Sequence, residues 1–345
     1  MSAFLGFGTA LPEHVVTPEE SLLALSGVFP RLRGVVPTET VTRRTAQPLS
    51  RVMEARSLDE SMALYAEHAP RLAVAAARSA LDSAQVRAQD VDLVISVSCT
   101  GYLVPSLDVR LARELGLRPD VVRLPITELG CSGGAAALAA AHRHLAAYPF
   151  DRVLVVAVEI CSLSFRPGDR SLDNLTASLV FGDGAAAAVL TGDAGGPEQA
   201  LRILATGEQV VPSSEKLLGF DLGSEGFRIV LDRSLPRLIR STLGEVVAGF
   251  ERRHGVPRRR FHVVHAGGPR IFDAVEAALC LDPDDLTASR QVFREFGNLS
   301  SASILFGLAG LEPDIQGDGL AIAFGPGVTV ALAHLRRGFG TAVAA

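Results

Sequence analysis

Short apolar strands alternate with helices along this chain, and they do so in both halves. In the first half, Asp92 to Ser98, Val121 to Ile126 and Arg152 to Glu159 have the composition of buried strands. Between them, Leu107 to Leu115 and Cys131 to Ala147 have the composition of helices. Strands that alternate with helices in this way form a sheet with helices on its faces. The sequence therefore predicts an α/β fold.

The second half repeats this alternation after a turn-rich boundary. A strand over Ala185 to Leu190 is followed by Asp193 to Pro197, a segment of turn-forming residues. We therefore expect two units, residues 1–195 and residues 196–345. The later elements are the helix Leu235 to Arg253, the strand Phe261 to His265, the helices Arg270 to Leu279 and Ser303 to Leu311, and the strands Leu320 to Phe324 and Val328 to Leu335.

Composition limits the class of protein. Of the 345 residues, 48% are hydrophobic and 21% charged, which is enough apolar material for two packed units. The net charge of −5 argues against a nucleic-acid partner. No apolar run reaches the roughly 18 residues of a membrane span, and the N-terminus lacks a signal-peptide pattern, so we expect a cytoplasmic protein with no membrane partner. No metal is expected, because paired spacing is absent among Cys99, Cys131, Cys161 and Cys280.

Cys131 is the first candidate for chemistry. It lies between Gly130 and the small residues that open an alanine-rich helix. A thiol at a helix N-terminus is close to the positive end of the helix dipole, which lowers its pKa and favours the thiolate. Cysteine is equally common as a small buried hydrophobe, so this segment alone leaves both interpretations open.

His265 and Asn298 are the candidate partners of this thiol. His265 ends a predicted strand and is followed by a glycine turn, and Pro269 opens the next helix. Asn298 lies at a similar corner before the helix that starts at Ser303. A thiolate beside an imidazole and an amide donor suits acyl transfer, because the donors stabilise charge that develops on a thioester oxygen. His262 is interpreted as a packed neighbour.

Five ordered motifs then give a resemblance to a known family. The chain resembles the type III polyketide synthases, the chalcone synthase-like branch of the thiolase-fold condensing enzymes, over nearly its whole length. Ala266 stands where the family has a proline beside the histidine, which would loosen that strand end, and Ala323 stands where the family has a glycine. The motifs are Gly130-Cys131 with Gly133-Gly134, Phe181-Gly182-Asp183-Gly184-Ala185-Ala186, His265 with Gly267-Gly268-Pro269, Gly297-Asn298 with Ser300-Ser301, and Phe324-Gly325-Pro326-Gly327.

The resemblance implies a duplicated αβαβα thiolase fold in which each half contributes one side of the site. It also implies a homodimer that loads an acyl-CoA starter on Cys131 and extends it by iterative decarboxylative condensation with malonyl-CoA. His265 would stabilise the thiolate and, with Asn298, hold the thioester oxygen. Cyclisation would give a pyrone- or resorcinol-type product. No cofactor is expected beyond the coenzyme A thioesters that serve as substrates.

The same resemblance suggests residues for the pocket and the carrier. Phe181 and Phe227 would gate the route from the coenzyme A tunnel, although Phe227 is equally well explained as a core aromatic. A second group, with ordinary small-residue packing as the alternative, would line the acyl cavity: Cys99, Cys161, Ser164, Ala177 and Ser300, together with the turn Gly267 and Gly268. Arginines that would contact coenzyme A phosphates, or else lie on the surface, are Arg31, Arg33, Arg43 and Arg44.

Three alternatives remain open from the sequence. A ketoacyl synthase III-like enzyme would perform a single condensation and take its substrate from an acyl carrier protein. A non-catalytic subunit would only bind acyl thioesters, and a cysteine protease would also use Cys, His and Asn. Within the resembled family, Cys99 and Cys161 replace plant-type threonines, which favours a bacterial member with an aliphatic starter.

Overall fold

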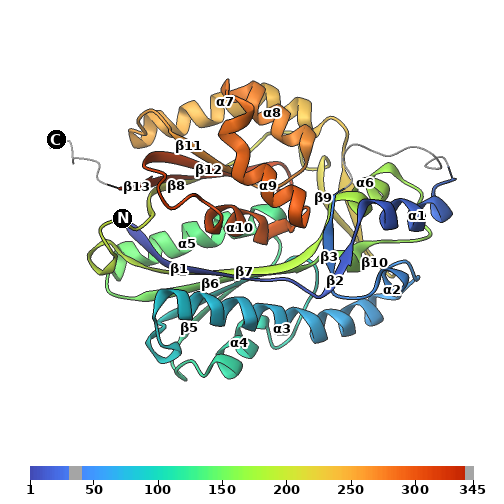
Figure 1. The fold of residues 1–345 in the computed structure, drawn as a ribbon, viewed down its shortest axis with the longest axis horizontal. Coiled ribbons are helices and arrows are strands. Elements are labelled where there is room, and N and C mark those ends of the chain that lie inside the picture. Colours follow the sequence, from blue (N-terminus) through green and yellow to red (C-terminus); the bar gives the residue numbers. More distant parts are fainter. Residues whose placement is uncertain (31–40, 339–345) are drawn as a thin grey trace.

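Helices and strands alternate in layers from the bottom to the top of Figure 1. The computed structural model describes residues 1–30 and 41–338. Each half of the chain contributes one layer of strands, and helices lie below, between and above these layers (Figure 1). From bottom to top the helices are α3 (Leu58–Ala84) and α4 (Leu107–Leu115), then α5 (Gly133–Ala147) and α10 (Ser303–Ala309), then α7 (Leu235–His254) and α8 (Pro269–Leu279).

The strand order shows the duplication of the two halves. In the described part of the chain a nine-stranded sheet has the order β11-β12-β13-β8-β1-β7-β6-β4-β5. Its strands are β1 (Ser2–Ala10), β4 (Leu93–Val97), β5 (Val122–Ile126), β6 (Arg152–Ile160), β7 (Asp183–Gly192), β8 (Arg202–Val210), β11 (Phe261–Val264), β12 (Gly317–Gly325) and β13 (Thr329–Arg337).

Pairing directions repeat outward from the centre of this sheet. β1 pairs antiparallel with β7 and β7 with β6, just as β8 pairs antiparallel with β13 and β13 with β12. The next pairs, β6 with β4 and β12 with β11, are parallel in both halves. The two copies meet where Ser2 pairs with Ile203 and Ala3 with Arg202. The fold is thus two similar α/β units joined through β1 and β8.

Smaller elements gather at one end of the layers, on the right of Figure 1. The end of α6 and the loop after it lie next to the site described below. These elements are β2 (His14–Val16), α1 (Pro18–Val28), β3 (Arg43–Thr45), α2 (Leu49–Val52), α6 (Leu172–Val180), and the hairpin of β9 (Leu218–Gly223) and β10 (Gly226–Leu231). α9 (Thr287–Phe296) lies between this end and the upper layers.

The predicted strands and helices are present, with ends shifted by a few residues. β4 and β6 are buried almost throughout because helices cover both faces of the sheet, and this burial explains their continuous apolar sequences. One boundary differs close to the site. The helix predicted from Cys131 begins at Gly133, and Cys131 itself lies in a 3₁₀ turn, η3 (Gly130–Ser132).

α3 lies outside the predicted elements, and its position explains two glycines of β1. A Cβ at Gly8 would be 2.3 Å from the carbonyl oxygen of Ala76, and one at Gly6 would be 2.5 Å from the backbone nitrogen of Ala84. The helix therefore packs against β1 with its backbone almost touching the strand. Small residues such as Ala73 and Ala80, both fully buried, form the helix face that permits this approach.

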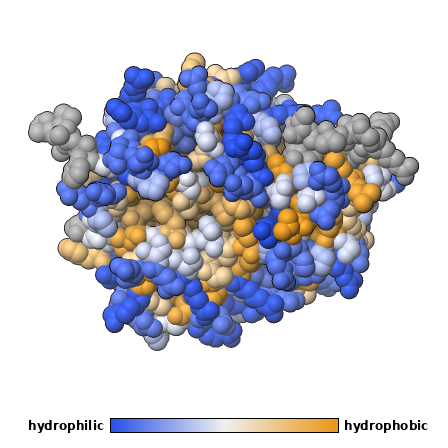
Figure 2. All heavy atoms as spheres, in the orientation of Figure 1, coloured by the Kyte–Doolittle hydropathy of each residue, from blue (hydrophilic) through white to orange (hydrophobic). Residues whose placement is uncertain are grey.

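Polar residues cover the upper and lower helical layers on the face shown in Figure 2, whereas hydrophobic atoms reach the surface in a band between them. This band lies at the level where the two halves of the chain meet (Figures 1 and 2). Over residues 1–30 and 41–338, no helix combines the length and apolar character needed to cross a membrane.

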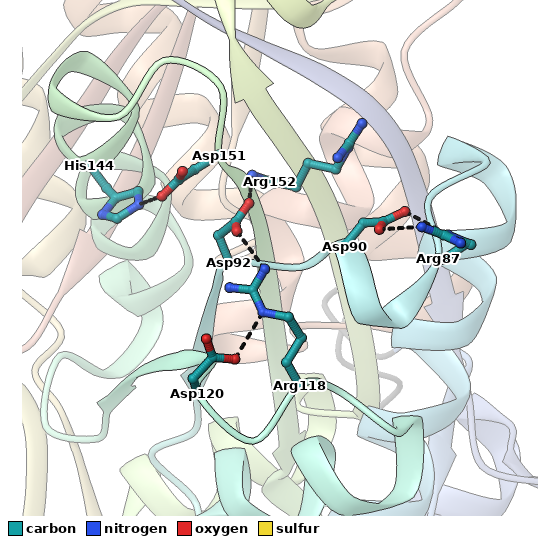
Figure 3. Close-up of polar contacts among 8 residues, drawn as sticks. All are labelled: Arg87, Asp90, Asp92, Arg118, Asp120, His144, Asp151 and Arg152. Carbon is teal, nitrogen blue, oxygen red and sulfur yellow. Dashed lines mark hydrogen bonds and ion pairs between the residues drawn. The ribbon is translucent and has the colours of Figure 1, made fainter.

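A cluster of ion pairs holds the loops that precede β4, β5 and β6 (Figure 3). The Asp92 carboxylate accepts a hydrogen bond from Nη1 of Arg118 at 3.0 Å and another from the backbone N–H of Arg152 at 2.8 Å. Nε of Arg118 also donates to the exposed Asp120 at 3.0 Å. Asp92 is thus the residue that joins two loops in this cluster. Two outlying pairs in the same view are Arg87 with Asp90 and His144 with Asp151.

Replacing Asp92 by Asn is expected to lower the free energy of unfolding by about 1–3 kcal/mol, because the amide keeps one acceptor and loses the charge that serves two donors. Urea unfolding followed by circular dichroism measures this difference. Asp120→Asn is the matched control, since its side chain is 79% exposed and exposed pairs contribute at most about 1 kcal/mol. Equal effects of the two substitutions would contradict the role given to Asp92.

Candidate active site

Glycines around Cys131 let three segments of the chain meet at this residue. Gly130 has a φ of +51°, and a Cβ there would lie 2.6 Å from the ring of Pro326 in the β12–β13 turn. A Cβ at Gly134 would lie 2.2 Å from the carbonyl oxygen of Ser301. The small residues after Cys131 therefore serve close packing of both halves, which is a stronger constraint than the helix entry inferred from the sequence.

His265 follows β11 and is held by backbone hydrogen bonds. Its N–H donates to the carbonyl of Ile322 on β12 at 2.8 Å, and its own carbonyl accepts from the N–H of Gly267 at 2.7 Å. Ala266, which replaces the proline expected from the family, is 1% exposed. The neighbouring strand and the tight turn after His265 thus fix this corner in the presence of alanine.

Asn298 is joined to the segment that carries Phe181. The N–H of Asn298 donates to the carbonyl of Val180 at 2.7 Å, and the N–H of Gly182 donates to the carbonyl of Asn298 at 3.0 Å. The side-chain Oδ1 of Asn298 accepts from the N–H of Ser300 at 2.9 Å. Because Oδ1 is used inside the protein, Nδ2 is the atom of this amide that is left to donate to a substrate.

One cavity brings the predicted catalytic residues together. Cys131, His265 and Asn298 all line it, and its volume is about 110 Å³. Phe181 and the turn Gly267–Gly268 form further parts of its wall, as predicted for substrate contact. Towards solvent the lining includes the exposed side chains of Arg233 and Arg270.

Burial determines the protonation of the free site. It raises the pKa of the Cys131 thiol to about 12 and lowers the pKa of His265 to about 4. Burial therefore opposes the thiolate predicted from the helix position, because the desolvation of a buried anion acts against the helix dipole. It favours a neutral thiol beside a neutral imidazole.

Ser300 and Cys99 connect the nucleophile to a buried carboxylate. Ser300 Oγ lies 3.3 Å from Cys131 Sγ and 3.4 Å from Cys99 Sγ, so one hydroxyl touches both thiols. The contact with Ser300 lowers the pKa of Cys131, in opposition to burial. On its other side, Cys99 Sγ contacts Glu159 Oε1 at 3.4 Å. Cys99 and Ser300 thus lie beside Cys131, although neither lines the cavity for which the resemblance suggested them.

Glu159 is a site residue that the sequence analysis missed. It is fully buried at the end of β6 and accepts hydrogen bonds from Cys99 N at 3.1 Å, Thr100 Oγ1 at 2.8 Å and Ser301 Oγ. Burial raises its pKa, and these bonds oppose that shift. An acidic residue at the end of an otherwise apolar strand is the sequence signal for such a group.

A second cavity lies on the other side of Phe181. Cys161, Ser164 and Ala177 line it, as does Phe181, whose ring also belongs to the first cavity. The end of α6 and the residue after it therefore form a partition, with Val180 facing the nucleophile and Ala177 facing the second cavity. Of the predicted acyl-cavity residues, the structure places Cys161, Ser164 and Ala177 at this second cavity and Gly267–Gly268 at the first, and it leaves Cys99 and Ser300 outside the lining of both.

Phe227 lies outside both cavities. Its ring packs against Tyr102 at 5.9 Å and Phe220 at 5.7 Å between centroids, and its carbonyl accepts from Arg166 Nε. Phe227 is half-buried and forms a partly exposed aromatic cluster with Phe220 of the β9–β10 hairpin and with Tyr102, outside the hydrophobic core. His262 is buried on β11 with both ring nitrogens unpartnered among the described residues, as a packed neighbour.

Two of the arginines suggested for phosphate binding, Arg43 and Arg44, are among the described residues. Arg43 is 5% exposed and donates to Ser21 Oγ and the carbonyl of Leu179, so its side chain points inward and the prediction was wrong. Arg44 donates to the carbonyl of Glu13. The residues Arg31 and Arg33 lie outside the described residues.

Comparison with known proteins gives consistent matches over the chain. Family models for chalcone and stilbene synthases match residues 31–194 with the N-terminal domain and residues 202–337 with the C-terminal domain. A 1,3,6,8-tetrahydroxynaphthalene synthase of Streptomyces coelicolor is 34% identical, with 95% of this chain and 92% of that protein aligned. The phloroglucinol synthase of Pseudomonas fluorescens is 30% identical over 93% of this chain and 95% of that protein.

Solved structures agree with the sequence matches. The crystal structure of the Streptomyces coelicolor tetrahydroxynaphthalene synthase, a bacterial type III polyketide synthase, has a TM-score of 0.91 and 34% identity. The match covers 98% of this chain and 100% of that one. Fold and site together define an acyltransferase with the duplicated αβαβα thiolase architecture.

The chain belongs to the chalcone and stilbene synthase family, the type III polyketide synthases. Its class of reaction is iterative decarboxylative condensation of malonyl-CoA followed by cyclisation, as the sequence analysis predicted. The single-condensation, non-catalytic and protease alternatives are not favoured by these matches.

Ser300→Ala is expected to move the pH profile of Cys131 alkylation by iodoacetamide upward by as much as about one pH unit, or about tenfold in rate at fixed pH. The reason is that the hydroxyl stabilises the thiolate and the methyl group does not. Mass spectrometry of the Cys131 peptide measures the rate. Ser178→Ala is the control, since that hydroxyl donates to the carbonyl of Asn174 at 2.5 Å in the second cavity. A profile unchanged by Ser300→Ala would refute this role.

Proposed function

We propose that Cys131 carries the growing acyl chain and that His265 and Asn298 stabilise the oxyanion and the enolate during each extension. The observation that supports this most directly is that the three side chains line one cavity, on segments from both halves of the chain. Phe181 lines the same cavity and would separate the reacting centre from the space behind it.

In the loading step, His265 takes the thiol proton as Cys131 Sγ attacks the starter thioester carbonyl. The C–S bond to coenzyme A breaks, and the imidazolium returns the proton to the departing sulfur. Both pKa shifts oppose this transfer and their effects add. The transfer is therefore coupled to the attack itself: the attraction between thiolate and imidazolium and the new bond from Sγ to the carbonyl carbon compensate for its cost.

In the extension step, malonyl-CoA loses CO₂ and leaves an enolate at its thioester oxygen. His265, again neutral, and Nδ2 of Asn298 would each donate a hydrogen bond to that oxygen. The enolate carbon then attacks the thioester on Cys131, a C–C bond forms, and the thiolate of Cys131 departs. The extended chain returns to Cys131 for the next round.

Coenzyme A would enter past Arg233 and Arg270. Both arginines are exposed and line the solvent side of the cavity that contains Cys131. Guanidinium groups match the geometry of phosphate oxygens, so a nucleotide-like carrier suits this mouth. An acyl carrier protein, whose prosthetic arm also ends in a thiol, is the alternative carrier for the same cavity.

The product would be a polyhydroxylated aromatic built from malonyl units, with a pyrone as the product of early release. This proposal follows the relatives, whose names specify tetrahydroxynaphthalene and phloroglucinol synthesis. An aliphatic starter, favoured by the sequence, remains a separate outcome of the same assay because it would add its own mass to the product.

Cys131→Ala is expected to abolish chain extension and acyl loading, since no other side chain would accept the starter. Asn298→Ala is expected to lower malonyl decarboxylation by about 10²–10³-fold, the usual effect of removing one oxyanion donor, while loading on Cys131 persists. Product masses after incubation with malonyl-CoA, alone and with short, long and aromatic starters, measure extension. Release of labelled CO₂ and intact-protein mass measure the two half-reactions.

Phe227→Ala is a matched control for these variants, because Phe227 lies outside both cavities. It should retain loading and decarboxylation. Iterative extension by the Cys131 variant would overturn the assignment of the nucleophile, and wild-type products heavier by a single unit would indicate one condensation per starter.

We also infer a homodimer, through β5. This strand is at the end of the sheet, and its outer edge is unpaired in the described chain. Val122 and Leu124 on it are 56% and 39% exposed, although exposed apolar edges normally need cover. A second copy of the chain would supply that cover.

Light scattering is expected to give the mass of a dimer for the wild type and the mass of a monomer for Leu124→Lys. A monomeric wild type would exclude this interface.

A further inference from the structure

The second cavity has more polar groups in its wall than a pocket for an alkyl chain would need. Besides apolar side chains, it is bordered by five hydroxyl groups and by a buried arginine, Arg43. Phe181 lines both spaces, and the second cavity has a volume of about 30 Å³, so a chain attached to Cys131 would have to displace the Phe181 side chain to enter it. The hydroxyl groups belong to Ser21, whose Oγ donates to the carbonyl of Thr17 at 2.8 Å, and to Thr45, Ser162, Ser164 and Ser178.

These hydroxyl protons are already used by the protein. Thr45 Oγ1 donates to the carbonyl of Gln47 at 2.8 Å, and Ser164 Oγ donates to the carbonyl of Cys161 at 2.7 Å. Ser162 Oγ donates to Asp183 Oδ2 at 2.6 Å, and Ser178 Oγ to the carbonyl of Asn174. The hydroxyl groups therefore have little left to donate to a ligand.

Arg43 is the donor that remains. A guanidinium has five N–H groups, and the hydrogen bonds of Arg43 to the described residues come from Nη1, at 2.9 Å from Ser21 Oγ and 3.3 Å from the carbonyl of Leu179. Asp183 is near enough to stabilise the cation, but its oxygens accept from Ser162 and the N–H of Ala46. Burial lowers the pKa of Arg43 to about 10, which leaves it charged at neutral pH.

Packing fixes the position of this arginine. A Cβ at Gly182 would lie 3.2 Å from the Cβ of Arg43, and a Cβ at Gly297 would lie 3.5 Å from it. Arg43 thus lies beside the segments that carry Phe181 and Asn298. A ligand bound by its guanidinium would consequently lie close to the partition between the two cavities.

We propose that Arg43 binds the oxygen pair of a β-diketone in the growing chain, and so retains the far end of an oxygen-rich poly-β-ketone in the second cavity. The inference rests on the proposed function, since it requires a chain that grows on Cys131. A planar guanidinium presents two parallel N–H groups, which match two neighbouring oxygens on one side of a flat ligand. An alkyl chain in the same space would offer no acceptor to this guanidinium, whose present partners are Ser21, the carbonyl of Leu179 and the charge of Asp183.

Retention of the far end affects which ring closes. In early release, an enol oxygen of a short chain attacks the thioester carbonyl, a C–O bond forms, the C–S bond breaks and the proton goes to the departing thiol. This lactonisation needs a chain that is free to fold back. A distal β-diketone held by Arg43 is kept away from the thioester, so extension continues and closure through carbon is favoured.

The test compares Arg43→Met with Arg43→Lys in assays with malonyl-CoA alone. Methionine fills similar volume without donors, and lysine keeps the charge without the planar fork. In Arg43→Met the ratio of full-length aromatic to short lactone is expected to fall by about tenfold or more, because one specific hydrogen-bonding contact is lost. Arg43→Lys should give an intermediate ratio. Product masses give the ratio, and CO₂ release gives the rate of decarboxylation.

Because the Arg43 variants could fail to fold, a second variant tests the same cavity without changing Arg43. In Ala177→Leu, a larger side chain on α6 fills part of the second cavity, so this variant should produce the same shift towards short lactones. Thermal unfolding and CO₂ release close to wild type would show that each variant is folded and still decarboxylates malonyl-CoA.

The outcomes separate the two proposals. Unchanged product ratios in folded Arg43→Met and Ala177→Leu, with CO₂ release intact, would overturn the role of Arg43 and leave the proposed function standing. Greater use of long acyl starters by Arg43→Met, with the malonyl-only products unchanged, would also overturn it, since the cavity would then be an alkyl pocket. Absence of CO₂ release in the wild type would overturn both.

Discussion

A carboxylate with no contact to solvent fixes the loops beneath the nucleophile. Glu159 is 0% exposed, and its oxygens accept from the loop after β4, through Cys99 and Thr100, and from Ser301 of the other half. Burying such a group is costly unless its acceptor sites are filled, so each of these donors is held in place. Ser300, next to Ser301, is thereby set against both thiols.

Backbone contacts between the halves complete the arrangement. Two backbone hydrogen bonds join the halves, from the N–H of Asn298 to the carbonyl of Val180 and from the N–H of Gly182 to the carbonyl of Asn298. The carbonyl of Ser301 also lies so close to Gly134 that any side chain there would collide with it. The motifs that identify the family are therefore largely the places where two backbones touch. Their glycines are required by proximity, and the chemistry of the site depends on that proximity.

The sequence predicts the fold and the catalytic trio because periodicity and motif spacing are local properties. The strands β4 and β6 follow from continuous apolar runs, and His265 follows from the end of one strand. Protonation of Cys131 depends on burial summed over the whole fold, which no local pattern contains. The direction of Arg43 is similar: an arginine in a short strand is usually exposed, and only the packing around Gly182 and Gly297 shows that it points inward.

The two cavities differ in the charge they present to a substrate. Around Cys131, burial keeps thiol and imidazole neutral, so negative charge on an enolate oxygen is met by hydrogen-bond donors and by a proton that moves within one pair. Behind Phe181, Arg43 is a fixed cation. A poly-β-ketone becomes richer in acidic β-diketone units with each extension, so its affinity for the second cavity should rise as it grows. The growing chain would thus react in a neutral cavity and be held in a second cavity that carries a positive charge. This difference is a physical reason for the chain to be extended before it closes into a ring.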